Sequence, residues 1–188
     1  MADEITPRYR ALIFAAGYTG ARFGELAALK VGRVDLNAAT MHIAESLAEV
    51  DGRLYTKEPK NGKTRTLELP GFLVEMLREQ MGLYPSTEGY VFSAAEGGPL
   101  RHHNFYRRHY KPAVLRAGLS PNLRLHDLRH SCASILIARG ANIKDVQEQL
   151  GHSSSRVTLD RYSHRFPGLT RRLQDDLQAV FEGAEQNE

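Results

Sequence analysis

The sequence lacks the residues that stabilise secreted domains and the long apolar runs that cross membranes. Among its 188 residues there is one cysteine, Cys132, and no tryptophan. A single cysteine excludes an internal disulfide and a cysteine-rich zinc site, and its apolar surroundings, CASILIA, are typical of a core position. No apolar run approaches the roughly 18 residues of a membrane-spanning helix, and the N-terminus, MADEITPRYR, has no signal-peptide pattern. We therefore expect a cytoplasmic protein without a membrane partner.

Acidic residues are missing from one long stretch, Gly97 to His126, although the net charge of the whole chain is only +3. Lysine, arginine, histidine and aromatic residues are interleaved there instead. Such a stretch favours a polyanionic partner, because lysine and arginine displace the counterions condensed on phosphates. A solvated basic helix face is the other reading. The candidate nucleic-acid contacts are Arg101, Arg107, Arg108, Lys111 and Arg124.

Hydrophobic periodicity predicts one α+β domain that is mainly helical, with a small three-stranded antiparallel sheet. A first helix is expected to begin at Thr6-Pro7, with Thr6 as the cap, and GYTGARFGE is expected to break it and begin a second helix through Glu25, Leu26 and Leu29. Further helices are expected over FLVEMLREQM, over residues 101–117 with a bend near Pro112, over HDLRHSCASILIARG, and over NIKDVQEQL with Asn142 as the cap. The expected strands, within about residues 40–69, are TMHIAESL, GRLYT and TRTLEL, with turns at Asp51-Gly52 and KNG.

The C-terminal segment LTRRLQDDLQAVF has apolar residues four apart, which predicts a helix over residues 167–182. This stripe could dock on its own core or on a neighbouring subunit. We expect residues 1–182 to form the domain and residues 183–188 to be a disordered tail. The apolar residues of the stripe are Leu169, Leu173, Leu177 and Phe181.

Three polar side chains of HDLRH, His126, Arg129 and His130, fall three and four residues apart on one helix side. Two histidines at this spacing could bind a metal, but no third ligand or nearby glutamate base is evident. A polar helix start with an ion-paired arginine is the default interpretation. In TGARFGE, Arg22 and Glu25 could likewise be no more than a capped helix.

The arginines and histidines named above, a lysine on a predicted β-turn and a tyrosine late in the chain together suit chemistry on a phosphodiester. Two arginines can bind its non-bridging oxygens and stabilise charge in the transition state. A tyrosine phenol can attack phosphorus if a histidine removes its proton, and a lysine can protonate the departing hydroxyl. Because the arginines supply the positive charge, we expect neither a metal nor a cofactor.

Four sequence blocks, in this order, resemble the catalytic domain of tyrosine recombinases of the phage integrase family. They are TG-R--GE at Thr19–Glu25, PKNGKTRTLELP at Pro59–Pro70, HDLRH at His126–His130 and LGHSSSRVTLDRYSH at Leu150–His164. The resemblance runs from about residue 5 to residue 182. It implies the tyrosine-recombinase catalytic fold and a bacterial or phage-encoded enzyme for site-specific DNA recombination, used in integration or excision.

The resemblance also assigns roles. Arg22 and Arg129 would bind the scissile phosphate, Glu25 would support Arg22, and His152 would donate a hydrogen bond to the phosphate. Tyr162 would be the nucleophile, forming a 3′-phosphotyrosyl link to DNA.

Two further roles concern protons. His126 would assist proton transfer at the tyrosine. Lys60, which follows a proline and opens the predicted turn, would protonate the leaving 5′ oxygen. Lys57 and Lys63 lie close enough in sequence to take that role instead.

The resemblance implies a double-stranded DNA attachment or core site as partner, a tetramer on DNA, and a monomer for the isolated domain. Family members carry an N-terminal DNA-clamping domain, and the sequence has no match to one. Three alternatives stay open. They are a type IB topoisomerase-like strand transferase, a non-catalytic helix-turn-helix protein built on ASILIARGANIKDVQEQLGHSSSRV, and a metal-dependent hydrolase that uses His126 and His130.

Overall fold

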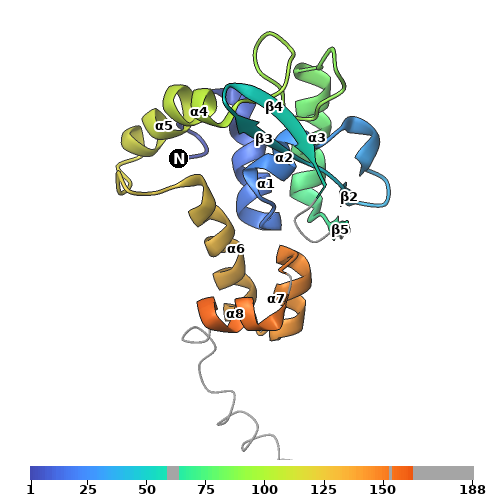
Figure 1. Cartoon of the computed structure of the whole chain (residues 1–188), viewed down its shortest axis with the longest axis vertical. Helices are drawn as coiled ribbons and strands as arrows, with labels where there is room; N and C mark the ends of the chain where they lie inside the picture. The colour runs from blue at the N-terminus through green and yellow to red at the C-terminus, as the bar shows by residue number, and fades with distance from the viewer. Residues whose placement is uncertain (59–63, 153, 163–188) are drawn as a thin grey trace, which may run out of the picture.

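The computed structural model describes residues 1–58, 64–152 and 154–162 (Figure 1). Its helices are α1 (Arg10–Thr19), α2 (Phe23–Ala28), α3 (Gly71–Leu83), α4 (His102–Phe105), α5 (Lys111–Arg116), α6 (Leu125–Ala138), α7 (Ile143–Leu150) and α8 (Ser155–Tyr162). Its strands are β1 (Val34–Asp35), β2 (Thr40–Ile43), β3 (Ser46–Val50), β4 (Arg53–Lys57) and β5 (Arg65–Glu68). The predicted α+β class, mainly helical, is confirmed.

The three-stranded antiparallel sheet is present, but its strands differ from those expected. Its order is β1-β2-β5, and β3 and β4 form a separate two-stranded sheet. The single strand predicted over TMHIAESL is in fact two strands, β2 and β3, and β1 is not predicted at all. Burial explains the pairing: Met41 of β2 lies opposite Leu67 of β5, and both are buried. Neither β3 nor β4 has a buried residue to hold it in that sheet.

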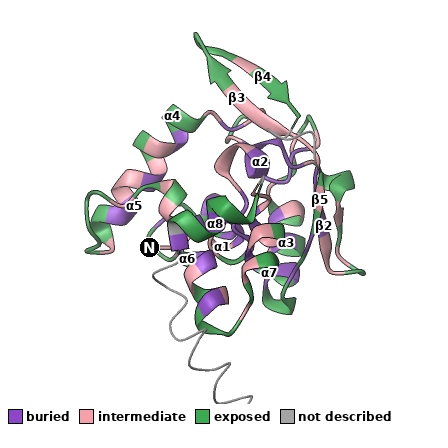
Figure 2. Ribbon diagram, turned by 60° about the horizontal axis from the view of Figure 1, so that its bottom comes forward, coloured by how far each residue is buried: buried purple, intermediate pink, exposed green. Residues whose placement is uncertain are grey.

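The β3–β4 hairpin projects from the rest of the fold and carries only exposed or partly buried residues (Figure 2). Asp51 and Gly52 connect the strands with φ angles of 49° and 74°. Both values are positive, as the commonest two-residue hairpin turn requires. The predicted Asp51-Gly52 turn is confirmed.

Two hydrophobic cores organise the helices. The larger contains buried residues of α1, α2, α3, β2, β5 and the α4–α5 region. The smaller lies between α6, α7 and α8, which Figure 1 shows grouped at the lower end of the fold. Its buried members are Ala133, Ile137, Val146, Leu150 and Tyr162.

The predicted helix ends fare differently. Asn142 caps α7, because its side chain accepts hydrogen bonds from the backbone N–H groups of Lys144 and Asp145. The predicted capping role of Thr6 is wrong: a 3₁₀ turn over Pro7–Tyr9 precedes α1, and the Thr6 hydroxyl lies 3.0 Å from Nδ1 of His109. The helix expected over residues 101–117 is present as α4, a π-helical turn over Tyr106–Tyr110 and α5.

Within the described residues, no helix combines the length and the apolar character needed to cross a membrane. The helix predicted over residues 167–182, with its Leu169–Phe181 stripe, and the predicted tail over residues 183–188 lie outside the described residues.

Gly20, which ends α1, is required by both conformation and space. Its φ is +67°, and an added Cβ would lie 2.5 Å from Cδ2 of Leu150 and 3.2 Å from Sγ of Cys132. We expect Gly20→Ala to lower the free energy of unfolding by about 2–4 kcal/mol, from left-handed strain and overpacking. Urea denaturation measures this change. Gly17→Ala, in the same helix with nothing within 4 Å of the added Cβ, should be neutral or stabilising. Equal stability of the two variants would contradict the prediction.

Candidate active site

Arg22 and Glu25 form a closed unit at the start of α2. The backbone N–H of Arg22 donates to Oε2 of Glu25 at 2.8 Å, and Nη1 of Arg22 donates to Oε1 at 2.8 Å. An acid in the first helical turn also interacts favourably with the helix dipole. The capped-helix interpretation of TGARFGE is therefore correct, and the same carboxylate orients the arginine side chain.

A second arginine, Arg65, binds the same carboxylate and is not among the predicted site residues. Its Nη1 donates to Oε1 of Glu25 at 3.1 Å, and its Nη2 donates to Oε2 at 2.7 Å. Arg65 begins β5, where it shares a strand face with Leu67, which is buried. A charged residue on the core face of a predicted strand, as Arg65 is in TRTLEL, is the sequence signal that could have indicated a buried ion pair.

The Glu25 carboxylate is 2% exposed and stays ionised because of these partners. Burial by itself raises the pKa of Glu25. The hydrogen bond and charge of Arg65 and those of Arg22 outweigh burial and hold the pKa below its ordinary value of 4.5. A carboxylate with a lowered pKa stabilises the fold above its unfolded pKa, and this stabilisation is lost as pH falls through the lower folded-state pKa.

We expect Glu25→Gln to destabilise the fold by about 3 kcal/mol at neutral pH, because it leaves two arginines without their buried partner. The difference from the wild type should shrink as pH falls through the folded-state pKa, where the wild type loses the same charge. Urea denaturation across the acid range measures both effects. The control is Glu75→Gln, which removes an exposed pair with Arg78 and should matter little at any pH. A pH-independent difference for Glu25→Gln would contradict this account.

Arg129, on α6, holds two backbone segments together from a buried position. Its Nη1 donates to the carbonyl of Gly20 at 2.6 Å, and its Nη2 donates to the carbonyl of Leu150. Burial lowers the pKa of Arg129, the charge of Arg22 lowers it further, and Glu25 partly offsets this. Arg22 and Arg65 bind the Glu25 carboxylate, and Arg129 lies close enough for the charges of all three to act on it. Three cations near one carboxylate leave an excess of positive charge suited to an anion.

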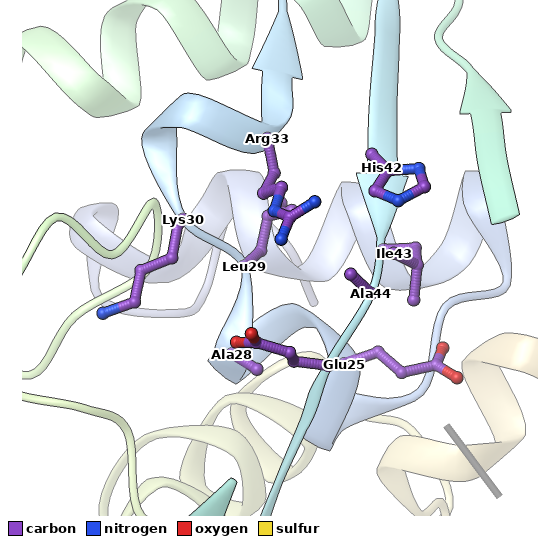
Figure 3. A pocket seen from close by; sticks show the side chains of 9 residues that line it. Glu25, Ala28, Leu29, Lys30, Arg33, His42, Ile43 and Ala44 are labelled. Atoms are coloured by element: carbon purple, nitrogen blue, oxygen red, sulfur yellow. The ribbon is translucent and has the colours of Figure 1, made fainter. Parts of the chain in front are cut away.

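One narrow pocket is lined by three of the predicted catalytic residues, Arg22, His126 and Arg129, among apolar side chains of α1 and α2. These residues come from two blocks that are about a hundred positions apart in the sequence. A separate pocket borders Glu25 and is lined by residues of α2, the turn after it and β2 (Figure 3). Of the predicted site residues that the structure describes, Glu25 alone lines this second pocket.

His152 follows the αL residue Gly151, which ends α7 with φ +63°. The backbone N–H of His152 donates to the carbonyl of Gln147 at 3.0 Å, and its Nδ1 lies 2.9 Å from the hydroxyl of Thr158, a buried residue of α8. These contacts fix the imidazole ring relative to α7 and α8. Ser153 lies outside the described residues, and α8 begins at Ser155.

Tyr162 is 2% exposed and belongs to the smaller core. Its hydroxyl oxygen lies 2.6 Å from Nδ1 of His130. The His130 ring in turn meets the His126 ring edge-on, with centroids 4.9 Å apart. His130 is thus the imidazole between Tyr162 and His126, a position that the motif pattern alone does not reveal.

Of the three candidate lysines, one lies in the part of the chain that the structure describes. Lys60 and Lys63 lie outside the described residues. Lys57 is described and ends β4, where it is exposed.

The candidate DNA-contacting residues do not form one equivalent set. Arg107 and Arg108 are exposed on the π-helical turn between α4 and α5. Arg101 donates to Glu49 and to the carbonyl of Gly52, so it is tied to the β3–β4 hairpin. The other two also have partners within the fold. Lys111 donates to the carbonyl of Pro121, and Arg124 pairs with Asp127 at the start of α6.

Comparison with known proteins gives a consistent family match. The phage integrase family model matches residues 2–168. The putative prophage phiRv2 integrase of Mycobacterium tuberculosis is 28% identical over 183 residues, covering 94% of this chain and 48% of the relative. A XerC-like tyrosine recombinase of Caldanaerobacter subterraneus subsp. tengcongensis is 31% identical, covering 85% of this chain and 46% of the relative. The chain therefore spans about half the length of these curated relatives.

Solved structures agree on the fold. The Tn1549 transposon integrase in complex with a circular intermediate DNA superimposes with a TM-score of 0.77 at 20% identity, covering 93% of this chain and 58% of that one. The XerH site-specific recombinase bound to difH substrate gives a TM-score of 0.66 at 25% identity, covering 96% of this chain and 50% of that one. With a family model that matches most of its length, this chain belongs to the phage integrase family.

Proposed function

We propose that this chain is the catalytic domain of a site-specific DNA recombinase that cuts and rejoins DNA through a 3′-phosphotyrosyl link. The observation that carries the proposal is the pocket shared by Arg22, His126 and Arg129. Two cations and an imidazole at one pocket match the needs of a reaction at a phosphodiester. Membership of the phage integrase family supports the same activity.

The proposed phosphate site uses Arg22 and Arg129. Their guanidinium groups would bind the non-bridging oxygens of the scissile phosphate and stabilise the charge that builds up during attack. The nearby Glu25 neutralises only part of the local charge, because Arg65 contributes a third cation. His152 would donate a further hydrogen bond to the phosphate from its imidazole ring, whose Nδ1 lies 2.9 Å from the Thr158 hydroxyl.

Cleavage in this proposal is a substitution at phosphorus. The Tyr162 oxygen forms a bond to phosphorus, and the bond between phosphorus and the 5′ oxygen breaks. The phenolic proton passes to an imidazole. Before DNA binds, the phenol oxygen lies 2.6 Å from Nδ1 of His130, whose ring meets that of His126, so these two rings are the proposed acceptors. The 5′ oxygen leaves as a hydroxyl after it takes a proton, a role for which Lys60 remains the prediction from the sequence.

Rejoining reverses these steps. The 5′ hydroxyl of another strand attacks the phosphotyrosyl phosphorus and releases Tyr162 as a phenol. The energy of the original phosphodiester is kept in the covalent link, so the exchange of strands needs no further energy source.

Double-stranded DNA is the proposed partner, and the basic residues between Arg101 and Arg124 would bind its phosphate backbone. Arg107 and Arg108 are exposed and would contact phosphates outside the pocket. Arg101, Lys111 and Arg124 have partners within the fold and would contribute through the local positive charge. Binding should weaken steeply with salt. We propose a monomer for the isolated domain and a tetramer on DNA.

A pool of nicked suicide duplexes of randomised sequence tests the activity on many target sequences at once. Cleavage next to the nick releases a short fragment, so the covalent intermediate is trapped. At low salt and high protein concentration, the proposal predicts a denaturant-resistant protein–DNA adduct, whose DNA can be sequenced to reveal the target. If no adduct forms across the pool, the proposed activity is wrong.

A further inference from the structure

Arg65 joins three elements around the proposed phosphate site. From β5, its Nη1 and Nη2 donate to the two carboxylate oxygens of Glu25 on α2. Its Nε donates to the carbonyl of Gln149, near the C-terminal end of α7, at 3.3 Å. The side chain is only 12% exposed, so these contacts form with little competition from water.

The end of α7 is shaped around this guanidinium. Gly151 has φ +63°, and a Cβ at that position would lie 2.8 Å from Nη1 and 3.0 Å from Cζ of Arg65. Arg65 therefore packs directly against the residue that precedes His152. The neighbouring Leu150 carbonyl accepts from Arg129, so two arginines hold consecutive carbonyls of the same helix end.

Glu25 transmits the position of Arg65 to Arg22. Each carboxylate oxygen accepts one bond from Arg65 and one from Arg22. The Arg22 side chain is 38% exposed, so its guanidinium depends on this carboxylate for orientation. A bidentate arginine on the far side restricts the rotation of the carboxylate, because two parallel bonds fix its plane.

We propose that Arg65 is a positioning residue for strand cleavage: it holds Glu25, and through it Arg22, against the end of α7 that carries His152. The proposal rests on the proposed function. Arg65 contacts neither the substrate nor the reacting atoms in this role. Its effect on the rate arises through the placement of Arg22, and small displacements of such groups cost large factors in rate.

Arg65→Lys is the informative substitution, because lysine keeps the charge and the strand position but loses the forked geometry. The assay is single-turnover cleavage of a suicide duplex recovered from the randomised pool, with increasing protein concentration. We expect the maximal cleavage rate to fall about 10–100-fold. The half-saturating protein concentration should stay within about twofold, because the net charge towards DNA is unchanged. Arg78→Lys, on the exposed face of α3, is the matched control and should cleave like the wild type.

A double substitution separates positioning from loss of stability. In an Arg22→Lys background, Arg65→Lys should lower the rate by less than about threefold, because the group that it positions is already altered. A purely structural role predicts the same factor in both backgrounds. Urea denaturation of each variant identifies the assay temperature at which all of them are folded.

The outcomes are distinct. Wild-type cleavage with a slow Arg65→Lys variant and strong non-additivity supports the proposal. Wild-type cleavage with an unaffected Arg65→Lys variant, or with additive effects, overturns the positioning role and leaves the proposed function intact. Failure of the wild type to form any adduct overturns both.

Discussion

Tyr162→Phe is expected to abolish the covalent protein–DNA adduct, the largest effect of any single substitution in this chain. Phenylalanine keeps the ring that packs with Val146 and Leu150 in the smaller core and removes only the hydroxyl that contacts His130. The variant should stay folded, with a loss of about 1 kcal/mol in the free energy of unfolding from one hydrogen bond. Gel electrophoresis under denaturing conditions measures the adduct, and urea denaturation measures the stability.

Tyr18→Phe is the matched control, since Tyr18 is 49% exposed on α1 and lies outside the proposed site. It should form the adduct as the wild type does. An adduct from Tyr162→Phe at the wild-type level would assign the nucleophile to another residue and remove the basis for the proposed chemistry.

Arg22→Ala and Arg129→Ala should each lower the cleavage rate by about 10²–10³-fold, because each removes a charge contact to the transition state. They should differ in stability. Arg129 is 2% exposed and donates to the carbonyls of Gly20 and Leu150, so its loss leaves two buried acceptors unpaired. The expected cost is about 2–5 kcal/mol. Arg22 is partly exposed, and Glu25 keeps Arg65 without it, so the expected cost is below about 1 kcal/mol.

Single-turnover cleavage and urea denaturation together separate the two variants. A folded, stable and inactive Arg22→Ala protein is the expected result, and it isolates the chemical role of a site arginine from its structural role. Equal stability of the two variants would mean that the carbonyl contacts of Arg129 contribute little. Near-normal cleavage by Arg22→Ala would mean that the phosphate lies elsewhere.

Local periodicity predicted most helices correctly because each helix buries a stripe that recurs along a short segment. The Asn142 cap and the Asp51-Gly52 turn were equally local and are confirmed. Strand pairing was not local: β5 returns to β2 across the intervening hairpin, and the partner is chosen by burial of Met41 and Leu67. No feature of TRTLEL alone distinguishes pairing with β2 from pairing with β4.

The site residues that could be predicted are those that lie in motifs with a recognisable order along the sequence. Arg22, His126 and Arg129 were assigned from motifs, and they line one pocket. Arg65 and His130 were missed as members of the site because their roles depend on which elements meet in three dimensions. Arg65 reaches Glu25 across forty positions, and His130 reaches Tyr162 across thirty-two.

The burial of Tyr162 bears on how the proposed reaction begins. Its side chain is 2% exposed and its hydroxyl contacts His130, so we expect α8 to shift or the side chain to turn outward before the hydroxyl reaches phosphorus. The contacts of Tyr162 in this structure therefore describe a resting arrangement. DNA bound at the arginines would favour an arrangement with Tyr162 at the phosphate if it binds that arrangement more tightly than the resting one.

The polarity and position of the DNA link test the central claim most directly. Adducts recovered from suicide duplexes labelled at either the 5′ or the 3′ end of the cleaved strand are digested with a protease, and the nucleotide-bearing peptide is sequenced by mass spectrometry. The account predicts that the 5′-labelled fragment remains on the protein, through a 3′-phosphate bonded to Tyr162. A link to the 3′-labelled fragment, or a nucleotide on any other residue, would contradict it.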